Sequence, residues 1–207
     1  MPRWSPDGKK IIFEEQPNAG KGYRIYVVSP EGGTPRELLA SDQGTQLHPD
    51  WSPDGAKIVF GGGWDDPQSV IRILDLTDDQ ISTVPGSQGF FFPRWSPNGR
   101  YIVARAFGPH RLVLFDFQTQ LWTELAQGGD STECWSKDGV YVYDLLGSPI
   151  SAVVRIRISD HKSEQVVDLK NFTIAGVHWL ALAPDDSPVL LRDTGTQDVY
   201  ALDWTDR

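Results

Sequence analysis

Five residues with charged or reactive side chains directly precede tryptophans, and they are the part of the sequence best suited to binding chemistry. They are Arg3, Asp50, Arg94, Cys134 and His178. A guanidinium group matches a carboxylate through two parallel hydrogen bonds, so an alternating Arg, Asp, Arg series could bind a small polar ligand or a peptide carboxylate. The alternative is that these three charges simply neutralise one another in a solvated space.

His48 lies two residues before Asp50, and three phenylalanines at positions 90–92 precede Arg94 in a similar way. Exposed aromatic side chains there would suit a partner peptide, but the same residues could equally belong to a hydrophobic core. The candidate ligand-binding residues are therefore Arg3, His48, Asp50, Arg94 and His178.

Motifs for catalysis or metal binding are missing from the sequence. The four histidines show no zinc-ligand spacing, and the acidic pairs lack the spacing of a calcium loop. There is also no phosphate-binding glycine motif and no Gly-x-Ser-x-Gly elbow. We therefore expect no catalytic residue, no bound metal and no cofactor.

A repeated pentapeptide organises the chain. Trp-Ser-Pro-Asp-Gly or a close variant occurs at Trp4–Gly8, Trp51–Gly55, Trp95–Gly99 and Trp135–Gly139, and Trp179 followed by Ala183–Asp186 is a divergent fifth copy. Proline presets φ, glycine allows a positive φ, and the Ser and Asp side chains can bond nearby backbone N–H groups, so each copy predicts a tight turn. We expect the tryptophan before each turn to be a buried anchor.

β-branched and aromatic runs follow each turn, which favours strands. The tryptophans are 47, 44, 40 and 44 residues apart by subtraction of their positions, and such a period with several strands per unit is typical of propeller blades. We predict an all-β fold: one β-propeller domain of four-stranded antiparallel blades, at about 1–44, 45–88, 89–129, 130–171 and 172–207. The fifth blade has three predicted strands, so we expect four full blades and a partial fifth.

This count suggests a fragment of a larger propeller, because closure of the ring removes exposed sheet edges. The alternative is a five-bladed ring with one thin blade. The innermost strand of each blade should line the central channel, which would place the residues before the tryptophans in a ring around it.

The composition narrows the possible partners. The 207 residues carry a net charge of −9, which disfavours a nucleic-acid-binding surface. The single cysteine, Cys134, excludes an intrachain disulfide, and no apolar run is long enough to span a membrane. The first repeat begins at Pro2, so we expect no signal peptide in this chain.

Repeats such as Pro49–Phe60 and Pro93–Val103, together with the strand and glycine turn at Arg24–Gly33, resemble the TolB-type, WD-repeat-like β-propeller family. The resemblance covers nearly the whole chain, although Lys137 replaces the turn proline in the fourth unit. Similar propellers occur as periplasmic subunits of envelope complexes, which favours an extracytoplasmic location. Others are C-terminal sensor-like modules of bacterial regulators, which the ending Leu191–Trp204 resembles.

The resemblance implies a non-enzymatic module that binds a protein or peptide, as the sensor or scaffold part of a larger bacterial protein. Further blades or an effector domain would then lie upstream. The alternative is the accessory, gating propeller of a prolyl-oligopeptidase-type serine peptidase whose catalytic domain is absent from this chain.

Overall fold

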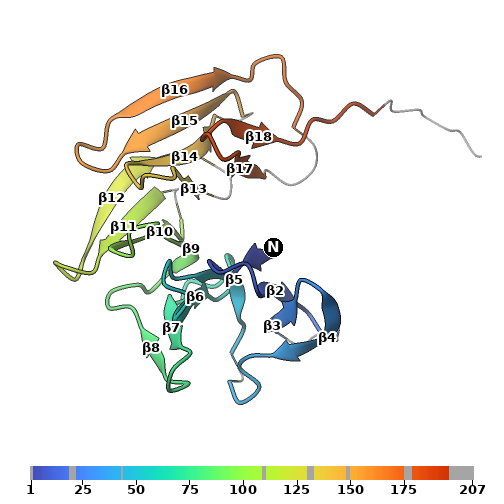
Figure 1. The fold of residues 1–207 in the computed structure, drawn as a ribbon. Helices are drawn as coiled ribbons and strands as arrows, with labels where there is room; N and C mark the ends of the chain where they lie inside the picture. Colours follow the sequence, from blue (N-terminus) through green and yellow to red (C-terminus); the bar gives the residue numbers. More distant parts are fainter. Residues whose placement is uncertain are drawn as a thin grey trace, which may run out of the picture.

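The chain folds into consecutive antiparallel β-sheets that stand side by side around a common centre (Figure 1). The structure is a computed structural model, and it describes residues 2–18, 22–42, 44–108, 111–129, 133–147, 150–174 and 179–195. These residues contain no helix. Each sheet is a blade, and the strands of a blade follow one another in the sheet in the order of the sequence.

The first four blades each contain four strands. Blade one comprises β1 (Arg3–Trp4), β2 (Ile11–Glu15), β3 (Arg24–Ser29) and β4 (Gly32–Glu37). Blade two comprises β5 (Leu47–Trp51), β6 (Lys57–Gly61), β7 (Arg72–Asp75) and β8 (Ile81–Thr83). Blade three comprises β9 (Phe90–Trp95), β10 (Tyr101–Ala106), β11 (Arg111–Asp116) and β12 (Leu121–Gln127). Blade four comprises β13 (Cys134–Trp135), β14 (Tyr141–Leu146), β15 (Ala152–Arg157) and β16 (Ser163–Asp168).

Blade five is smaller. It comprises β17 (Leu180–Leu182) and β18 (Pro188–Leu190), with a further bridge between Ile174 and Arg192. The end of the predicted fifth blade, residues 196–207, lies outside the described residues. The fold class is confirmed: a β-propeller of four full blades and part of a fifth. The exact blade limits and the assignment to one domain stay predictions.

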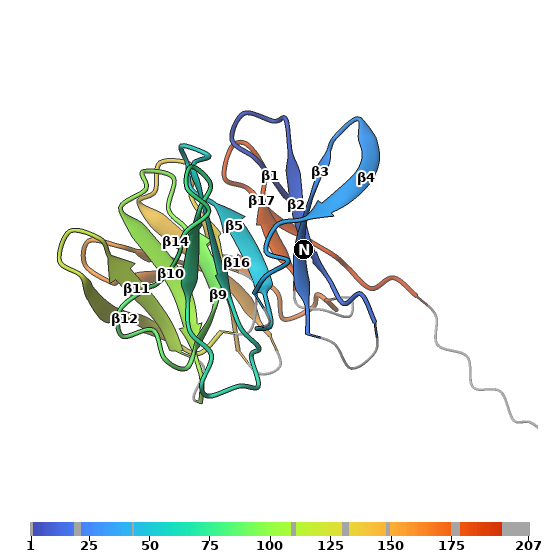
Figure 2. The same ribbon diagram turned by 90° about the horizontal axis from the view of Figure 1, so that it is seen from below.

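Figure 1 places the first strand of each blade near the centre and β4, β8, β12 and β16 at the outside. Figure 2, seen from below, shows the sheets packed face to face. The ring is open between blade five and blade one in Figure 1.

The repeated pentapeptide forms the predicted turn in blades one to four. In blade two, the Ser52 hydroxyl donates to Asp54 over 2.5 Å and accepts the backbone N–H of Lys57 over 2.8 Å. Asp54 also accepts the N–H of Ala56, and Gly55 takes a φ of 71°. The hydrogen bond from the Ser52 hydroxyl is the main reason that the pKa of Asp54 lies below its usual value. Since the same bonds recur in each full blade, with Asn98 in place of the aspartate in blade three, this side chain serves the turn rather than a ligand.

Apolar clusters join each blade to the next. Trp51, for example, packs with Ile58 and Phe60 of its own blade against Ile12 and Ile25 of blade one. Similar clusters join blades two and three, three and four, and four and five. Among the described residues, no cluster joins blade five to blade one.

The prediction that every repeat tryptophan is a buried anchor is only partly right. Trp51 is 7% exposed, but Trp4 is 61% exposed. The difference follows from packing, because Trp51 lies against blade one, and no described blade covers Trp4.

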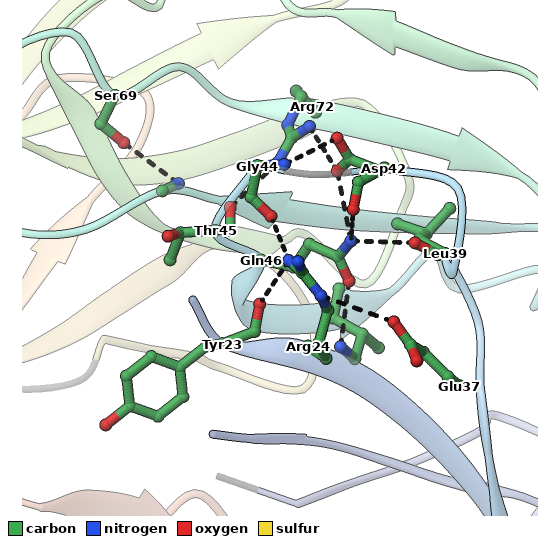
Figure 3. A network of polar contacts seen from close by, with 12 residues as sticks. Tyr23, Arg24, Glu37, Leu39, Asp42, Gly44, Thr45, Gln46, Ser69 and Arg72 are labelled. Carbon is green, nitrogen blue, oxygen red and sulfur yellow. Dashed lines mark hydrogen bonds and ion pairs between the residues drawn. The ribbon is translucent and has the colours of Figure 1, made fainter. Parts of the chain in front are cut away.

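A polar network fixes the connection between blades one and two (Figure 3). Gln46 is fully buried; its amide donates to the carbonyl of Leu39 over 3.2 Å and accepts the N–H of Ile25 over 3.1 Å. Arg72 of blade two reaches back to Asp42 over 2.6 Å and to the carbonyl of Thr45 over 2.9 Å. These bonds satisfy the backbone groups of a buried crossing, so the network positions the inner strand that follows it.

Candidate functional site

The inner strands place four of the five residues before the repeat tryptophans on successive blades. Arg3 lies on β1, Asp50 on β5, Arg94 on β9 and Cys134 on β13. Neighbouring inner strands are bonded to each other: the indole of Trp51 donates to the carbonyl of Arg3 over 3.3 Å. The arrangement therefore places these four positions around the centre of the ring.

Asp50 and Arg94 connect blades two and three. One carboxylate oxygen of Asp50 accepts the backbone N–H of Trp95 over 2.9 Å. Arg94 is 3% exposed, and its Nη1 donates to the carbonyls of Pro93 over 2.9 Å and His48 over 3.2 Å. Among the described residues no ion pair joins Arg94 to Asp50, and mutual neutralisation of Arg3, Asp50 and Arg94 stays the alternative interpretation.

The charge of Arg94 is held in an unfavourable place. Burial and the nearby charge of Arg3 lower its pKa to about 10, and the charges of Asp50 and Glu133 oppose this shift. Several buried nitrogen atoms here have no hydrogen-bond partner among the described residues: Nε of Arg3, Nε of Arg94 and both ring nitrogens of His48. Unpaired N–H donors on Arg3 and Arg94, two neighbouring cations, are suited to bind an anionic group.

His48 and Phe92 occupy equivalent positions, three residues before Trp51 and Trp95, and both have a left-handed backbone. Their φ angles are 57° and 54°, and each lies where the inner strand shifts register against its neighbour. The other described non-glycine residues with positive φ lie in turns between strands. A left-handed conformation costs an L-residue about 1–2 kcal/mol, and bulges that redirect side chains are common at functional sites.

The two bulges bring their side chains together. The rings of His48 and Phe92 are 3.8 Å apart between centroids, and Phe91 lies 5.1 Å from Phe92. All three residues are half-buried. The structure thus joins His48 to the aromatic run at 90–92, at one end of the inner strands and next to Arg94.

We predict that His48 makes the fold sensitive to acid. Burial, together with the charges of Arg94 and Arg3, lowers the pKa of His48 to about 2. Glu14, the facing acid, has its carboxylate 3.9 Å from Nδ1. A lowered pKa means stability that is present above the unfolded pKa of about 6.5 and is lost as the pH falls below it. The free energy of unfolding should therefore fall by about 2 kcal/mol from pH 7 to pH 5 on account of this residue.

The test is urea unfolding at several pH values. His48→Gln should remove this part of the pH dependence, and the exposed His161→Gln should leave it unchanged. If the free energy of unfolding depends on pH equally in His48→Gln and in the parent chain, His48 accepts a proton in the folded state as readily as in the unfolded state.

Cys134 is not suited to nucleophilic chemistry. Its thiol donates to the carbonyl of Leu180 on blade five over 3.1 Å. Burial raises its pKa to about 11, so little reactive thiolate forms near neutral pH. Cys134 thus serves to hold blade five against blade four.

The structure shows that the predicted anchor of blade five, Trp179, is wrong. Ala183 donates to the carbonyl of Ser187, and Asp186 takes the left-handed place of the turn glycine, with a φ of 62°. This turn begins directly after Leu182, so Leu182 and not Trp179 occupies the anchor position. The channel residue of blade five is then Ala181. His178, which we predicted from Trp179, lies outside the described residues.

The sequence contained the signal for this correction. In every full blade the anchor directly precedes the turn, and in blade five the residue directly before Ala183 is Leu182. Because the anchors of the other blades are tryptophans, the nearby Trp179 was chosen instead of Leu182.

A buried ion cluster between blades three and four was not predicted. Arg105, Glu133 and Asp144 are 3%, 1% and 2% exposed. Arg105 pairs with Glu133 through Nε and with Asp144 through Nη2 over 2.7 Å. Although burial lowers the pKa of Arg105, the two carboxylates outweigh it and raise that pKa above its usual value. A charged residue inside an otherwise apolar strand, such as Arg105 in β10, was the available signal.

A membrane-spanning helix and a metal-binding cluster are both absent from the described part of the chain. The described residues include no helix long and apolar enough to span a membrane. They also include no group of three or more His, Cys, Asp or Glu side chains placed to hold a metal ion.

The fold and the inner-strand arrangement define a TolB-type β-propeller fold. The structure is similar to TolB from Acinetobacter baumannii, with a TM-score of 0.70 and 19% identity over 89% of this chain and 46% of that one. It is also similar to a putative TolB from Agrobacterium tumefaciens, with a TM-score of 0.67 and 20% identity over 80% of this chain and 63% of that one. The chain thus spans about half to two thirds of the length of these structures.

A third similar structure comes from a study of two prolyl endopeptidases. Its TM-score is 0.54, with 16% identity over 88% of this chain and 30% of that one. No protein-family model and no curated protein matches the sequence. At these identities the similarities concern the fold alone.

Proposed function

We propose that the chain is a non-enzymatic propeller module that binds a protein or peptide through the end of its channel where His48 and Phe92 meet. It would act as the sensor or scaffold part of a larger bacterial protein. The observation that carries this proposal is the pair of left-handed residues at equivalent bulges, whose rings contact each other beside Arg94.

The chemistry of this end fits a peptide. Half-buried rings offer apolar contact to a peptide side chain. The unpartnered Nε atoms of Arg3 and Arg94 offer donors to a carboxylate, either the peptide C-terminus or an acidic side chain. Asp50 lies on the same strand as His48, and its backbone bond to Trp95 keeps that strand in place.

A displayed library of random peptides, selected on the immobilised chain, tests the proposal. We expect enriched peptides to lose binding at least about tenfold, or about 1.4 kcal/mol, to the double variant His48→Gly, Phe92→Gly. Glycine takes the left-handed backbone of both positions without strain, so this variant should stay folded.

Trp64→Ser is the matched control, because Trp64 is an exposed aromatic side chain on the loop between β6 and β7, away from the inner strands. Its binding should not change. Peptides that bind the double variant and the parent equally well, or a selection that enriches none, would reject the proposed site.

The accessory propeller of a prolyl-oligopeptidase-type peptidase is the second candidate, and the similarity to the prolyl endopeptidase structure favours it. Gene sequence on either side of this chain distinguishes the two. A hydrolase domain downstream would support the peptidase, and a regulatory domain upstream would support the sensor.

A further inference from the structure

The interfaces between blades repeat one arrangement. In blade two, one face of the sheet carries the anchor Trp51 with Ile58 and Phe60 of β6, and we call such a face the Trp face. It packs on the opposite face of blade one, which presents Ile12 and Ile25. The three side chains of this Trp face are only 7%, 0% and 0% exposed.

Blade one has the same Trp face with the same residue types. Trp4 pairs with Ile11 across β1 and β2, and Phe13 lies two residues further along β2. Tyr26 of β3 pairs with Phe13, and their rings stack with centroids 5.8 Å apart. Trp4, Ile11 and Phe13 thus correspond one by one to Trp51, Ile58 and Phe60.

This face of blade one is uncovered among the described residues. Trp4 is 61% exposed, while Ile11, Phe13 and Tyr26 are half-buried. By contrast, Ile12 and Ile25 on the other face of the same sheet are fully buried against blade two. The exposure is therefore specific to the Trp face and not general to the blade.

Two of the three covered tryptophan anchors also donate a hydrogen bond to the preceding blade. The indole of Trp51 donates to the carbonyl of Arg3, and that of Trp135 donates to the carbonyl of Arg94 over 3.2 Å, whereas that of Trp95 donates to the carbonyl of Gly99 in its own turn. The indole of Trp4 has no such acceptor among the described residues. What it lacks is a carbonyl on the inner strand of a preceding blade.

We propose that the Trp face of blade one binds a further four-stranded blade of the same repeat class, seated before blade one in the ring. Its contact face would be aliphatic, like that formed by Ile12 and Ile25, and its inner strand would offer a carbonyl to the Trp4 indole. The ring is open on this side of blade one in Figure 1. The two TolB structures extend beyond the part that matches this chain, which covers 46% and 63% of their lengths.

The proposal continues an interface already present between the described blades, which distinguishes it from an isolated apolar patch. It is independent of peptide binding at His48 and Phe92, which lie on blades two and three. Loss of one proposal therefore leaves the other standing.

A duplicated blade provides the test. Residues 2–48 are inserted before Pro2, so that the junction His48–Pro2–Arg3–Trp4 reproduces the natural His48–Pro49–Asp50–Trp51. Trp4 of the added copy is changed to phenylalanine, so that only the original Trp4 is read. Hydroxyl-radical footprinting with mass spectrometry then measures the oxidation rate of each tryptophan.

We expect the original Trp4 to be oxidised about as fast as the exposed Trp64 in the parent chain, and to slow toward the rate of Trp51 in the extended variant. Changing Ile25 to glutamate in the added blade alone should restore fast oxidation of Trp4, because it places a charge on the contact face. A second variant carries residues 49–92 instead, which end before the sequence Pro93–Pro97 that is identical to Pro2–Pro6.

Two results would overturn the proposal. One is a Trp4 that stays as reactive as Trp64 in both extended variants, with their circular dichroism still that of a β-sheet protein. The other is a Trp4 already protected in the parent chain in a concentration-dependent way, with a dimer in light scattering, which would make a second copy the occupant.

Discussion

Replacing Arg105 with methionine is expected to lower the free energy of unfolding by about 3–5 kcal/mol. The change removes the cation that pairs with both Glu133 and Asp144 in the buried cluster, and methionine fills most of the volume. It also leaves the carbonyls of Gly128 and Gly129 without the donor Nη1. Two buried carboxylates would then lose the cation that they share, which is the costly way to break a buried ion pair.

Urea denaturation measures this loss, and Arg111→Met is the matched control on the next strand. Arg111 pairs with Glu124 over 3.5 Å, but both side chains are about 40% exposed, so the change should cost less than about 1 kcal/mol. The double change Glu133→Gln, Asp144→Asn in the Arg105→Met background should recover much of the loss. Equal losses for Arg105→Met and Arg111→Met would mean that water enters the cluster.

Much of the fold could be predicted because residues adjacent in sequence determine the turn between the first two strands of each full blade. Pro53 presets one backbone angle, Gly55 allows another, and Ser52 and Asp54 complete the turn within one pentapeptide. A signal repeated in register needs no knowledge of distant contacts. Blade five shows the limit, because Leu182 keeps the place of the anchor but not its residue type.

The environment of the site could not be predicted in the same way, because it depends on neighbouring blades. The sequence predicts Arg94 as a ligand-binding residue of the channel. In the structure Arg94 is buried, and its guanidinium holds the carbonyl of His48 on the preceding blade. Likewise, the left-handed backbone of Phe92 has no sequence signal, because bulky residues rarely adopt it.

The exposure of Trp4 follows the same principle. Trp4 and Trp51 head the same motif, yet one is exposed and the other is buried, because only Trp51 has a described blade against it. Sequence specifies the face, and assembly of the ring decides whether that face is buried.

The contrast between Trp4 and Trp51 leads to a second prediction with a large expected effect on stability. We expect Trp51→Ala to lower the free energy of unfolding by about 3–5 kcal/mol, as removal of a large core aromatic side chain does. The indole packs with Ile12 and Ile25 of blade one and donates to the carbonyl of Arg3. Its removal therefore opens a cavity in the interface between two blades and loses an inter-strand hydrogen bond.

Trp4→Ala is an unusually close control for Trp51→Ala, since the motif is the same and only the neighbour differs. It should change stability by no more than about 0.5 kcal/mol in this chain. If the two substitutions cost the same, burial against a preceding blade would not be what makes the anchor stabilising. If instead Trp4→Ala becomes as costly as Trp51→Ala once a blade is added before Pro2, the energy of the anchor belongs to the interface between blades and not to the turn that follows it.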